Sequence, residues 1–556
     1  MTATPMQRSA HLDSFARDHL PPREQWPELL FELPELQYPP RLNAVAELLD
    51  RQVECGHADR PALWMAVDGK PVFATYAQLQ YRVNKIARVL VEDLGLKPGN
   101  RVLLRGPNNP MMAACWLAVV KAGMIAVATM PLLRARELKQ IIDKAEVSIA
   151  LCDVALWQVI ATCTNPNGEL YCESLRRVCY FNDPELGGLE QMIHSKPGTF
   201  NAVDTAADDC ALIAFTSGTT GEPKGTMHFH RDILAMCDCF PASTLKVLPN
   251  DIFCGTPPLA FTFGLGGMLA FPMRYGASTI LTEKSTPDSL LASIATFKAT
   301  ICFTAPTFYR QMAGLAKKHD LRSLKKCVSA GEALPDATRQ MFRKATGIEL
   351  IDGIGATEMI HIFISHTPET VRRGATGRAI PGYRAMVQDE AGNACAPGVV
   401  GRLAVKGPTG CRYLADPRQT DYVKNGWNLT GDAYSMDADG YFFFVARTDD
   451  MIVTAGYNVA GPEVEACLLA HPAVAECGVV GQPDAERGQI VKAFVVLRAG
   501  HQGDRALAKA LQDYAKANIA PYKYPREVEF VAALPRTETG KLQRFKLRQT
   551  HSAPAR

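Results

Sequence analysis

Short runs of aliphatic and β-branched residues alternate with longer amphipathic stretches between about residues 60 and 445. Four of these runs lie at residues 101–105, 125–129, 147–151 and 278–282. The stretches at 76–94 and 134–144 carry apolar residues at helical spacing instead. Strands that alternate with helices in this way predict an α/β architecture whose sheets are mostly parallel.

The pattern becomes richer in strands between residues 392 and 441. The apolar runs are short there, and Gly/Asp turns such as Asp389–Gly392 and Asp437–Gly440 separate them. This rhythm predicts a small barrel at the end of the α/β part.

A polar step, Thr448–Asp450, precedes a separate α+β pattern. The elements expected in it are strands at 473–480 and 491–497 and a helix at 504–518. A chain of 556 residues is also too long for one hydrophobic core. We therefore expect a large N-terminal domain over residues 1–448 and a smaller mobile α+β domain over residues 449–556, with Asp449 at the boundary.

Composition excludes several classes of protein. Apolar residues make up 47% of the chain and charged residues 21%, which is typical of a folded soluble protein. The net charge is +3, from 60 basic and 57 acidic residues, and no long basic run occurs, so we expect no nucleic-acid partner. The apolar stretch 111–130 is interrupted by Lys121 and Gly123. It predicts a buried helix that leads into a core strand, and no membrane span.

The location is predicted from two further features. The N-terminal segment has no apolar run of the kind found in secretory signals. The 16 cysteines are scattered and form no CxxC pair, which favours reduced thiols that serve as small hydrophobic residues. These features predict a cytoplasmic protein.

The segment Phe215–Gly225 carries the clearest chemical signal, and it follows a predicted strand at 211–215. Three of its residues are glycines, which let the backbone approach a ligand closely, and four carry hydroxyl groups. Backbone N–H groups, these hydroxyls and Lys224 can surround phosphate oxygens. It is not a Walker A loop, because the GxxxxGK[ST] spacing is absent from the chain. The alternative, an ordinary surface turn, is disfavoured by eleven consecutive residues of this composition.

Four later segments place charged residues at or after polar turns. Glu358 ends the segment Asp352–Glu358, and its carboxylate can hold a Mg²⁺ that also bridges phosphates. Asp432 follows a glycine and can accept hydrogen bonds from two ribose hydroxyls. The third is Arg447–Ile452, and the fourth places Lys541 after a polar glycine turn. Taken singly, each of these residues could equally be a solvated turn residue.

Taken together, the five segments span residues 211–541 in order and resemble the adenylate-forming superfamily. This superfamily contains acyl-CoA synthetases, peptide-synthetase adenylation domains and luciferases. The resemblance implies ATP, Mg²⁺ and coenzyme A as cofactors. It also implies two steps: a carboxylate attacks the α-phosphorus of ATP to form an acyl-adenylate and pyrophosphate, and a thiol then displaces AMP.

The resemblance assigns roles to individual residues. Lys541 is the catalytic lysine, Thr357 contacts the α-phosphate, Glu358 holds Mg²⁺, and Asp449 is the hinge of the mobile domain. The cofactor-binding positions implied are Thr216, Ser217, Gly218, Thr219, Thr220, Gly221, Lys224, Ala330, Gly331, Glu332, Asp352, Gly353, Ile354, Asp432, Arg447 and Gly456.

The run Thr357–Phe363 resembles benzoate-type CoA ligases, whose histidine at the position of His361 lines the aryl pocket. The segment Ala260–Gly266 resembles the aromatic wall of that pocket. The substrate-binding positions implied are Phe261, Phe263, Gly264, Ser329, Gly355 and His361. A satisfied core histidine and ordinary core phenylalanines are the structural alternatives.

The N-terminal segments 11–22 and 25–27 look most like 2-aminobenzoate (anthranilate)–CoA ligases. The expected substrate is therefore a small aromatic carboxylic acid, 2-aminobenzoate. Benzoate or a hydroxybenzoate stays open, as does an adenylation enzyme that loads an aryl acid onto a carrier protein. A luciferase-like oxygenase and a nucleotide sensor without turnover are alternatives from other classes. A homodimer is also left open.

Overall fold

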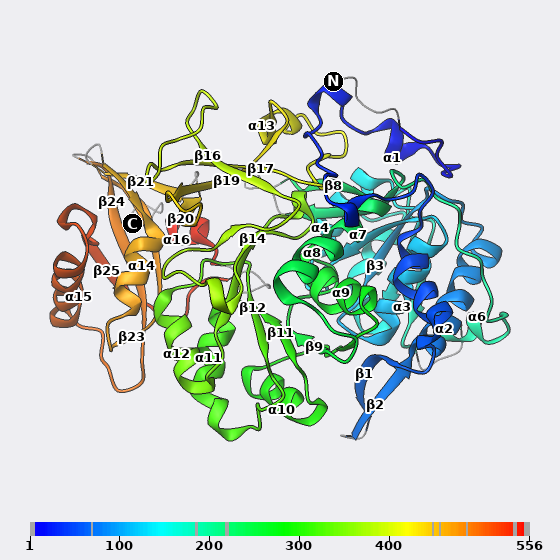
Figure 1. Cartoon of the computed structure of the whole chain (residues 1–556), viewed down its shortest axis with the longest axis horizontal. Helices are drawn as coiled ribbons and strands as arrows, with labels where there is room; N and C mark the ends of the chain where they lie inside the picture. Colours follow the sequence, from blue (N-terminus) through cyan, green and yellow to red (C-terminus); the bar gives the residue numbers. More distant parts are fainter. Residues whose placement is uncertain are drawn as a thin grey trace.

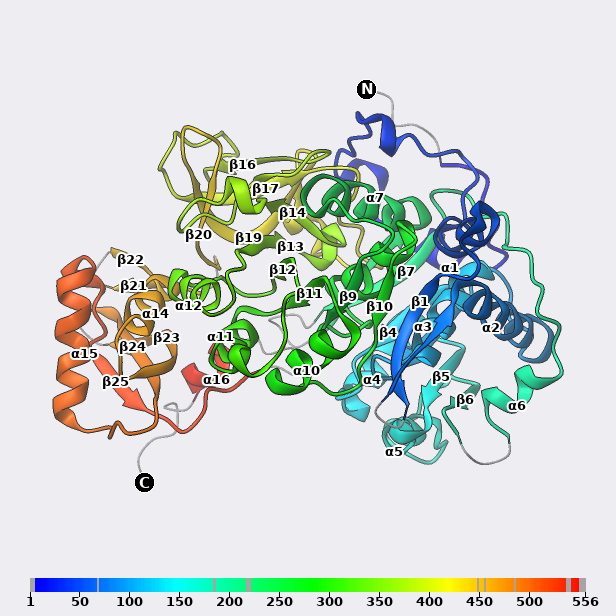
Figure 2. The same cartoon turned by 60° about the horizontal axis from the view of Figure 1, so that its bottom comes forward.

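The computed structural model describes residues 6–67, 70–183, 187–216, 222–447, 450–454, 457–484, 487–536 and 542–549. A large body of layered sheets and helices lies beside a smaller body formed by the C-terminal part of the chain, at the left of Figure 1 and again in Figure 2. The expected mixed α/β fold class is confirmed.

The first sheet of the large body has the strand order β6-β5-β3-β4-β7-β8. Its neighbouring strands are parallel, apart from the antiparallel pair β7–β8. The strands are β3 (Arg101–Arg105), β4 (Ile125–Thr129), β5 (Ile149–Asp153), β6 (Arg177–Phe181), β7 (Cys210–Thr216) and β8 (Lys224–Phe229). The helices of this part are α1 (Phe15–Asp18), α2 (Tyr76–Arg88), α3 (Pro110–Lys121), α4 (Ala135–Ala145), α5 (Trp157–Ala161), α6 (Leu189–His194) and α7 (His230–Phe240).

Helix α3 is buried on every side, as its nearly continuous apolar sequence requires. Each residue of Met111–Val120 is at most 6% exposed. Lys121 at the end of the helix is buried as well, and its Nζ donates to Asp50 Oδ1 and Asn84 Oδ1, both at 2.6 Å. The pairing offsets the cost of burying its charge. The predicted buried helix followed by a core strand is therefore confirmed. No helix within the described ranges is long and apolar enough to cross a bilayer.

The second sheet has the order β15-β14-β13-β12-β11-β9-β10-β1-β2. It is parallel from β13 to β1 and antiparallel at both edges. Its strands are β1 (Pro61–Val67), β2 (Lys70–Thr75), β9 (Ile252–Gly255), β10 (Ser278–Ile280), β11 (Ile301–Thr304), β12 (Lys326–Ser329), β13 (Leu350–Gly355), β14 (Ile362–Ser365) and β15 (Arg378–Ala379). Its helices are α8 (Thr262–Leu265), α9 (Phe271–Arg274), α10 (Pro287–Phe297), α11 (Pro306–Leu315) and α12 (Asp336–Thr346).

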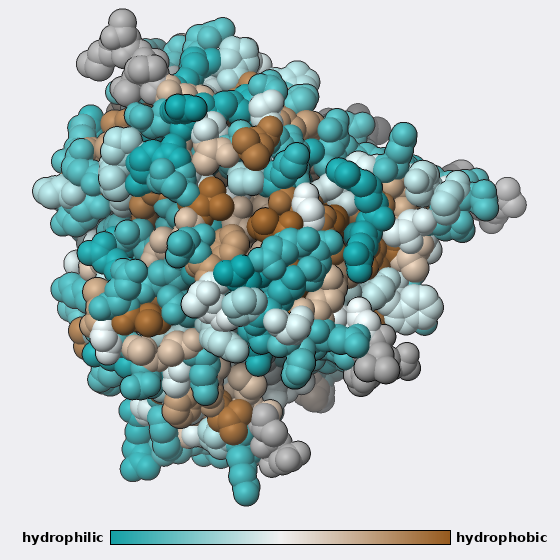
Figure 3. All heavy atoms as spheres, turned by 90° about the vertical axis from the view of Figure 1, so that its right-hand side faces the viewer, coloured by the Kyte–Doolittle hydropathy of each residue, from teal (hydrophilic) through white to brown (hydrophobic). Residues whose placement is uncertain are grey.

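One hydrophobic cluster joins both sheets, with Leu104 of β3, Trp116 of α3 and Phe303 of β11 among its members. The thiols contribute to the apolar interior, since all cysteines except Cys55, Cys395 and Cys467 are buried. The face at the right of Figure 1 is mainly hydrophilic, with scattered hydrophobic side chains (Figure 3).

The strands between residues 384 and 447 form an antiparallel sheet. They are β16 (Arg384–Gln388), β17 (Gly401–Lys406), β18 (Val423–Lys424), β19 (Trp427–Met436) and β20 (Phe442–Arg447), with α13 (Gln419–Tyr422) beside them. The small barrel predicted here stays a prediction: β16 pairs with β17 and β20 with β19, and isolated bridges join Gln388 to Ala394 and Phe442 to Gly377.

The C-terminal part has a hydrophobic core of its own. Its elements are β21 (Met451–Thr454), β22 (Tyr457–Ala460), α14 (Gly461–Leu469), β23 (Val474–Asp484), β24 (Gly488–Leu497), α15 (Arg505–Asn518), β25 (Glu527–Phe530) and α16 (Arg544–Gln549). The predicted strands and helix are confirmed here. Asp504 begins α15 as expected, since its carboxylate accepts from the N–H of Leu507 at 2.7 Å. The boundary at Asp449 stays a prediction, because this residue lies outside the described residues.

Candidate active site

The phosphate-loop segment lies between β7, which ends at Thr216, and β8, which begins at Lys224. These two residues are antiparallel partners, so both ends of the loop meet. The loop residues outside the described ranges are Ser217, Gly218, Thr219, Thr220 and Gly221. Lys224 Nζ donates to Tyr413 Oη at 3.3 Å, which places the lysine beside a segment almost 190 residues later in the chain.

Glu358 lies in a short 3₁₀ turn, η11 (Thr357–Met359), directly after β13. The residue is only 8% exposed, and its Oε1 accepts a hydrogen bond from the phenol of Tyr413 at 2.5 Å. A largely buried carboxylate is stable when a cation or several donors satisfy it. Carboxylate oxygens are the ligands that Mg²⁺ prefers. Glu358 therefore fits a divalent cation beside the phosphate loop.

A buried polar chain holds the turn that carries Glu358. His228 Nε2 donates to the carbonyl oxygen of Thr357 at 2.8 Å. Burial lowers the pKa of His228 to about 4, so the imidazole is neutral at pH 7 with its proton on Nε2. Its Nδ1 lies 3.9 Å from Asp232, and Asp232 forms an ion pair with Arg412. Sequence reasoning missed this chain because none of its polar residues belongs to a recognised motif.

Asp432 and Arg447 face each other across β19 and β20 as register partners. Arg447 Nη1 lies 3.3 Å from Asp432 Oδ1 and donates to the carbonyl of Thr430 at 3.0 Å. Gly431 has φ +77°, a left-handed conformation that favours glycine. The structure therefore brings together the two residues that the sequence predicts as ribose ligands.

The end of β13 lies beside this region and contains Asp352, Gly353, Ile354 and Gly355. Burial raises the pKa of Asp352 to about 7. A Cβ on Gly355 would lie 2.7 Å from the carbonyl oxygen of His361, so glycine is needed where the two segments approach. This close approach puts Gly353 and Ile354, which the resemblance implies as cofactor-binding positions, next to the expected aryl pocket.

Strand β12 ends at Ser329, and the loop that follows it contains Ala330, Gly331 and Glu332. Ser329 pairs with Asp352 in the parallel register, so this loop borders β13. Glu332 Oε2 accepts from Thr307 Oγ1 at 2.9 Å, and its Oε1 accepts from Arg536 Nη1 at 3.1 Å. Because Arg536 belongs to the C-terminal part, the two parts of the chain meet at this loop.

His361 lies inside an aromatic cluster and is 3% exposed. The ring centroids nearest to its own are those of Phe271 at 4.5 Å, Phe263 at 5.6 Å, Phe240 at 5.9 Å and Phe303 at 6.5 Å. Neither ring nitrogen has a hydrogen-bond partner within the described residues. Burial lowers the pKa of His361 to about 3, although the backbone of Phe263 opposes this shift. The imidazole is therefore neutral at pH 7.

The structure separates the two phenylalanines that the sequence groups together. Phe263 contacts His361, whereas Phe261 lies at the N-cap of α8 and is not among the rings around the histidine. Gly264 is required sterically, because a Cβ there would lie 2.0 Å from the carbonyl oxygen of Pro258. The remaining rings of the cluster come from distant segments, and their apolar sequence context has no feature that marks them as pocket residues.

Three predicted residues of the C-terminal part, Asp449, Gly456 and Lys541, lie outside the described residues. The residue after Lys541 is Leu542, which forms an isolated antiparallel bridge with Arg536. The described residues on either side of the catalytic-lysine segment are therefore paired with each other and adjoin Glu332.

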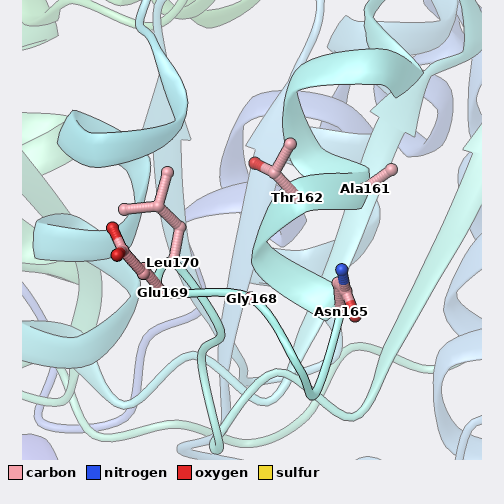
Figure 4. Close-up of a pocket in the computed structure, with 6 residues that line it drawn as sticks. All are labelled: Ala161, Thr162, Asn165, Gly168, Glu169 and Leu170. Atoms are coloured by element: carbon pink, nitrogen blue, oxygen red, sulfur yellow. The ribbon is translucent and has the colours of Figure 1, made fainter.

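A separate surface hollow lies at α5 and the loop that follows it (Figure 4). Its lining residues are Ala161, Thr162, Asn165, Gly168, Glu169 and Leu170. None of them belongs to the five motif segments, so the hollow is no part of the candidate site. No cluster of three or more His, Cys, Asp or Glu side chains suited to a metal occurs in the described ranges.

Known proteins show the same organisation. Residues 49–413 match the family model "AMP-binding enzyme", and residues 463–541 match "AMP-binding enzyme C-terminal domain". Benzoate–CoA ligase of Thauera aromatica is 33% identical, over 93% of this chain and 97% of that protein. 3-Hydroxybenzoate–CoA ligase of an Aromatoleum strain is 32% identical, over 91% and 97%. The crystal structure of the anthranilate CoA ligase AuaEII with anthranoyl-AMP superposes with a TM-score of 0.87, at 33% identity over 93% of this chain and 98% of that one.

Proposed function

Because the chain belongs to the AMP-binding enzyme family and is an AMP-forming acid–thiol ligase, we propose that it converts 2-aminobenzoate, ATP and coenzyme A to 2-aminobenzoyl-CoA, AMP and pyrophosphate. The observation that supports this substrate best is the neutral, unpartnered imidazole of His361 within a cluster of phenylalanine rings.

The aromatic cluster favours a flat ring over a flexible acyl chain. Phe263 and Phe271 offer ring faces and edges, with which an aryl substrate gains offset or edge contacts. A neutral imidazole has one N–H donor and one acceptor nitrogen. The acceptor suits an N–H of a 2-amino substituent, and leaving either polar group buried without a partner costs about 1–3 kcal/mol. The benzoate and hydroxybenzoate relatives favour the same class of acid.

The nucleotide side of the site is proposed from the five motif segments, and the contacts among Glu358, Tyr413 and Lys224 support it. We assign the ribose hydroxyls to Asp432 and Arg447, and the phosphates to Thr216, Ser217, Gly218, Thr219, Thr220, Gly221, Lys224 and Thr357. Glu358 would hold Mg²⁺, which supplies positive charge to the phosphate oxygens. The protein residues position the carboxylate and the α-phosphorus and neutralise charge, because phosphoryl transfer depends mainly on those two effects.

The C-terminal part, proposed as the mobile domain 449–556, would contribute in both steps. In the first, Lys541 stabilises the negative charge that develops as the substrate carboxylate bonds to the α-phosphorus and pyrophosphate leaves. The contact of Arg536 with Glu332 supports this approach, because Arg536 is bridged to the residue after Lys541. In the second, rotation about Asp449 brings the Gly456 segment to the site. The CoA sulfur then bonds to the carbonyl carbon, AMP leaves with the former acyl–oxygen bond broken, and the thiol proton passes to solvent.

The direct test is pyrophosphate–ATP exchange followed by mass spectrometry. With Mg²⁺, exchange should require 2-aminobenzoate, and adding coenzyme A should yield 2-aminobenzoyl-CoA and AMP in equal amounts. Pyrophosphate exchange without formation of the CoA thioester would exclude coenzyme A as the acceptor. Acylation of a carrier protein would then support the alternative acceptor.

A further inference from the structure

We propose that Tyr413 is a positioning residue for the Mg²⁺–ATP site. Its hydroxyl holds the Glu358 carboxylate in the orientation that receives the cation. The proposal rests on the proposed function only in assigning Mg²⁺ and ATP to this site. It does not depend on which acid the enzyme activates.

Tyr413 is fixed beside the phosphate loop by its backbone. Its neighbours pair with β8 on both sides: the N–H of Met227 donates to the carbonyl of Arg412, and the N–H of Leu414 donates to that of Gly225, both at 2.8 Å. The N–H of Tyr413 donates to Gln419 Oε1 at 2.9 Å. The side chain is fully buried. The phenol therefore has a fixed direction before any ligand binds.

The phenol hydroxyl joins the two charged groups of the site. It donates to Glu358 Oε1 at 2.5 Å and accepts from Lys224 Nζ at 3.3 Å. A phenol is protonated at neutral pH and a carboxylate can only accept, so Tyr413 is the donor of its bond to Glu358.

This arrangement has two consequences for a bound cation. The hydrogen bond occupies one carboxylate oxygen of Glu358 and fixes the side-chain rotamer, which leaves the second oxygen as a ligand. Since ordering a long side chain on binding costs conformational entropy, a rotamer already fixed in the free protein strengthens cation binding. The same hydroxyl lies between Lys224 and the carboxylate of Glu358. It therefore keeps the lysine from forming a direct ion pair with Glu358 and leaves the ammonium group available to phosphate oxygens.

Tyr422 supplies a matched control. Its ring packs edge-on against that of Tyr413, with centroids 5.8 Å apart, and it is also buried. Its hydroxyl has no hydrogen-bond partner among the described residues. Removing that hydroxyl perturbs the same core and breaks no hydrogen bond to Glu358.

The experiment measures ATP binding by calorimetry, with Mg²⁺ and with EDTA, on the full chain without any acid. The quantity compared is the factor by which Mg²⁺ tightens ATP binding. Tyr413→Phe should lower this factor about fivefold or more, a coupling of the usual size between neighbouring sites, and Tyr422→Phe should leave it unchanged. Glu358→Gln should lower it too, and adding Tyr413→Phe to that variant should cause no further loss, because the two residues act as a unit.

The proposal would be overturned if Mg²⁺ tightens ATP binding by the same factor in Tyr413→Phe as in the parent protein. It would also be overturned if Tyr413→Phe and Tyr422→Phe lower this factor equally. If Tyr413→Phe does not fold, ¹⁹F NMR of the protein with 3-fluorotyrosine at position 413 decides instead. Its resonance should shift with Mg²⁺–ATP and not with ATP in EDTA, and equal shifts in both would contradict the proposal. A parent that binds Mg²⁺–ATP but does not activate 2-aminobenzoate would refute the proposed substrate and leave this inference intact.

Discussion

Arg536 Nη1 lies 3.1 Å from Glu332 Oε1, and this ion pair joins the C-terminal part of the chain to the loop after β12. The same guanidinium reaches Glu476 Oε2 at 2.8 Å within the C-terminal part. One arginine thereby connects β23 with the loop that holds the predicted cofactor-binding residue Glu332. The Arg536 side chain is 25% exposed, so solvent screens the pair only in part.

Arg536→Ala should slow adenylate formation about fivefold, because a partly buried ion pair contributes about 1 kcal/mol. Thioester formation from added 2-aminobenzoyl-adenylate should keep its parental rate, since the proposed mechanism gives that step another orientation of the C-terminal part. Single-turnover rates of the two half-reactions measure this. Arg322→Ala, which removes an exposed arginine paired with Asp320, is the control. Equal slowing of both half-reactions would indicate a general loss of structure instead.

Lys541→Ala should reduce adenylate formation about 100- to 1,000-fold, the range found when a group that stabilises transition-state charge is removed. It should spare the reaction of supplied adenylate with coenzyme A. Quench-flow measurement of each half-reaction gives both rates. Adenylation at the parental rate would show that Lys541 is not the catalytic lysine.

His361→Leu should lower kcat/KM for 2-aminobenzoate about 10- to 100-fold more than for benzoate, because only the 2-amino group of 2-aminobenzoate loses a hydrogen-bond partner. Steady-state kinetics with both acids measure the ratio. The matched variant Phe271→Leu removes a neighbouring ring without a polar group. Phe271→Leu should lower kcat/KM for both acids by the same factor. An unchanged ratio in His361→Leu would mean that the imidazole does not contact the substituent.

Asp352 should make stability depend on pH. Its pKa is raised to about 7 by burial, so across the range from the ordinary carboxyl value to about 7 the folded protein holds a proton that the unfolded chain releases. Folding stability therefore falls as pH rises through this window and is constant above it. The Asp352→Asn variant has no carboxyl group at this position and should not lose stability in this way as pH rises. Urea unfolding at pH 5 and pH 8 should show the variant gaining stability relative to the parent at pH 8. The same stability difference between variant and parent at both pH values would contradict a raised pKa for the buried carboxyl of Asp352.

Elements with a strong periodic pattern could be predicted from the sequence. The run 125–129 is a strand with those bounds, whereas the run 147–151 becomes β5 at Ile149–Asp153, because sheet pairing and not the apolar run sets the ends. The barrel stays a prediction, since short strands and turns do not specify whether edge strands meet. That depends on tertiary pairing.

The candidate site shows the same division. Glu358, Asp432 and Arg447 belong to motifs, and the structure places each as part of a polar contact that suits the predicted role. Phe263 could be predicted from the segment Ala260–Gly266, whereas Tyr413 and the rings of Phe240, Phe271 and Phe303 could not be predicted, because they lie outside every recognised motif. Only the pairing of β8 with residues 412–414 brings the phenol to Glu358.

The central claim is tested most directly by AMP release from Mg²⁺–ATP and coenzyme A with 2-aminobenzoate, benzoate, 4-hydroxybenzoate and hexanoate, compared by kcat/KM. The account predicts the highest value for 2-aminobenzoate and the lowest for hexanoate. A preference for hexanoate would contradict the aryl pocket around His361. A preference for benzoate would keep the pocket and contradict the role of its imidazole.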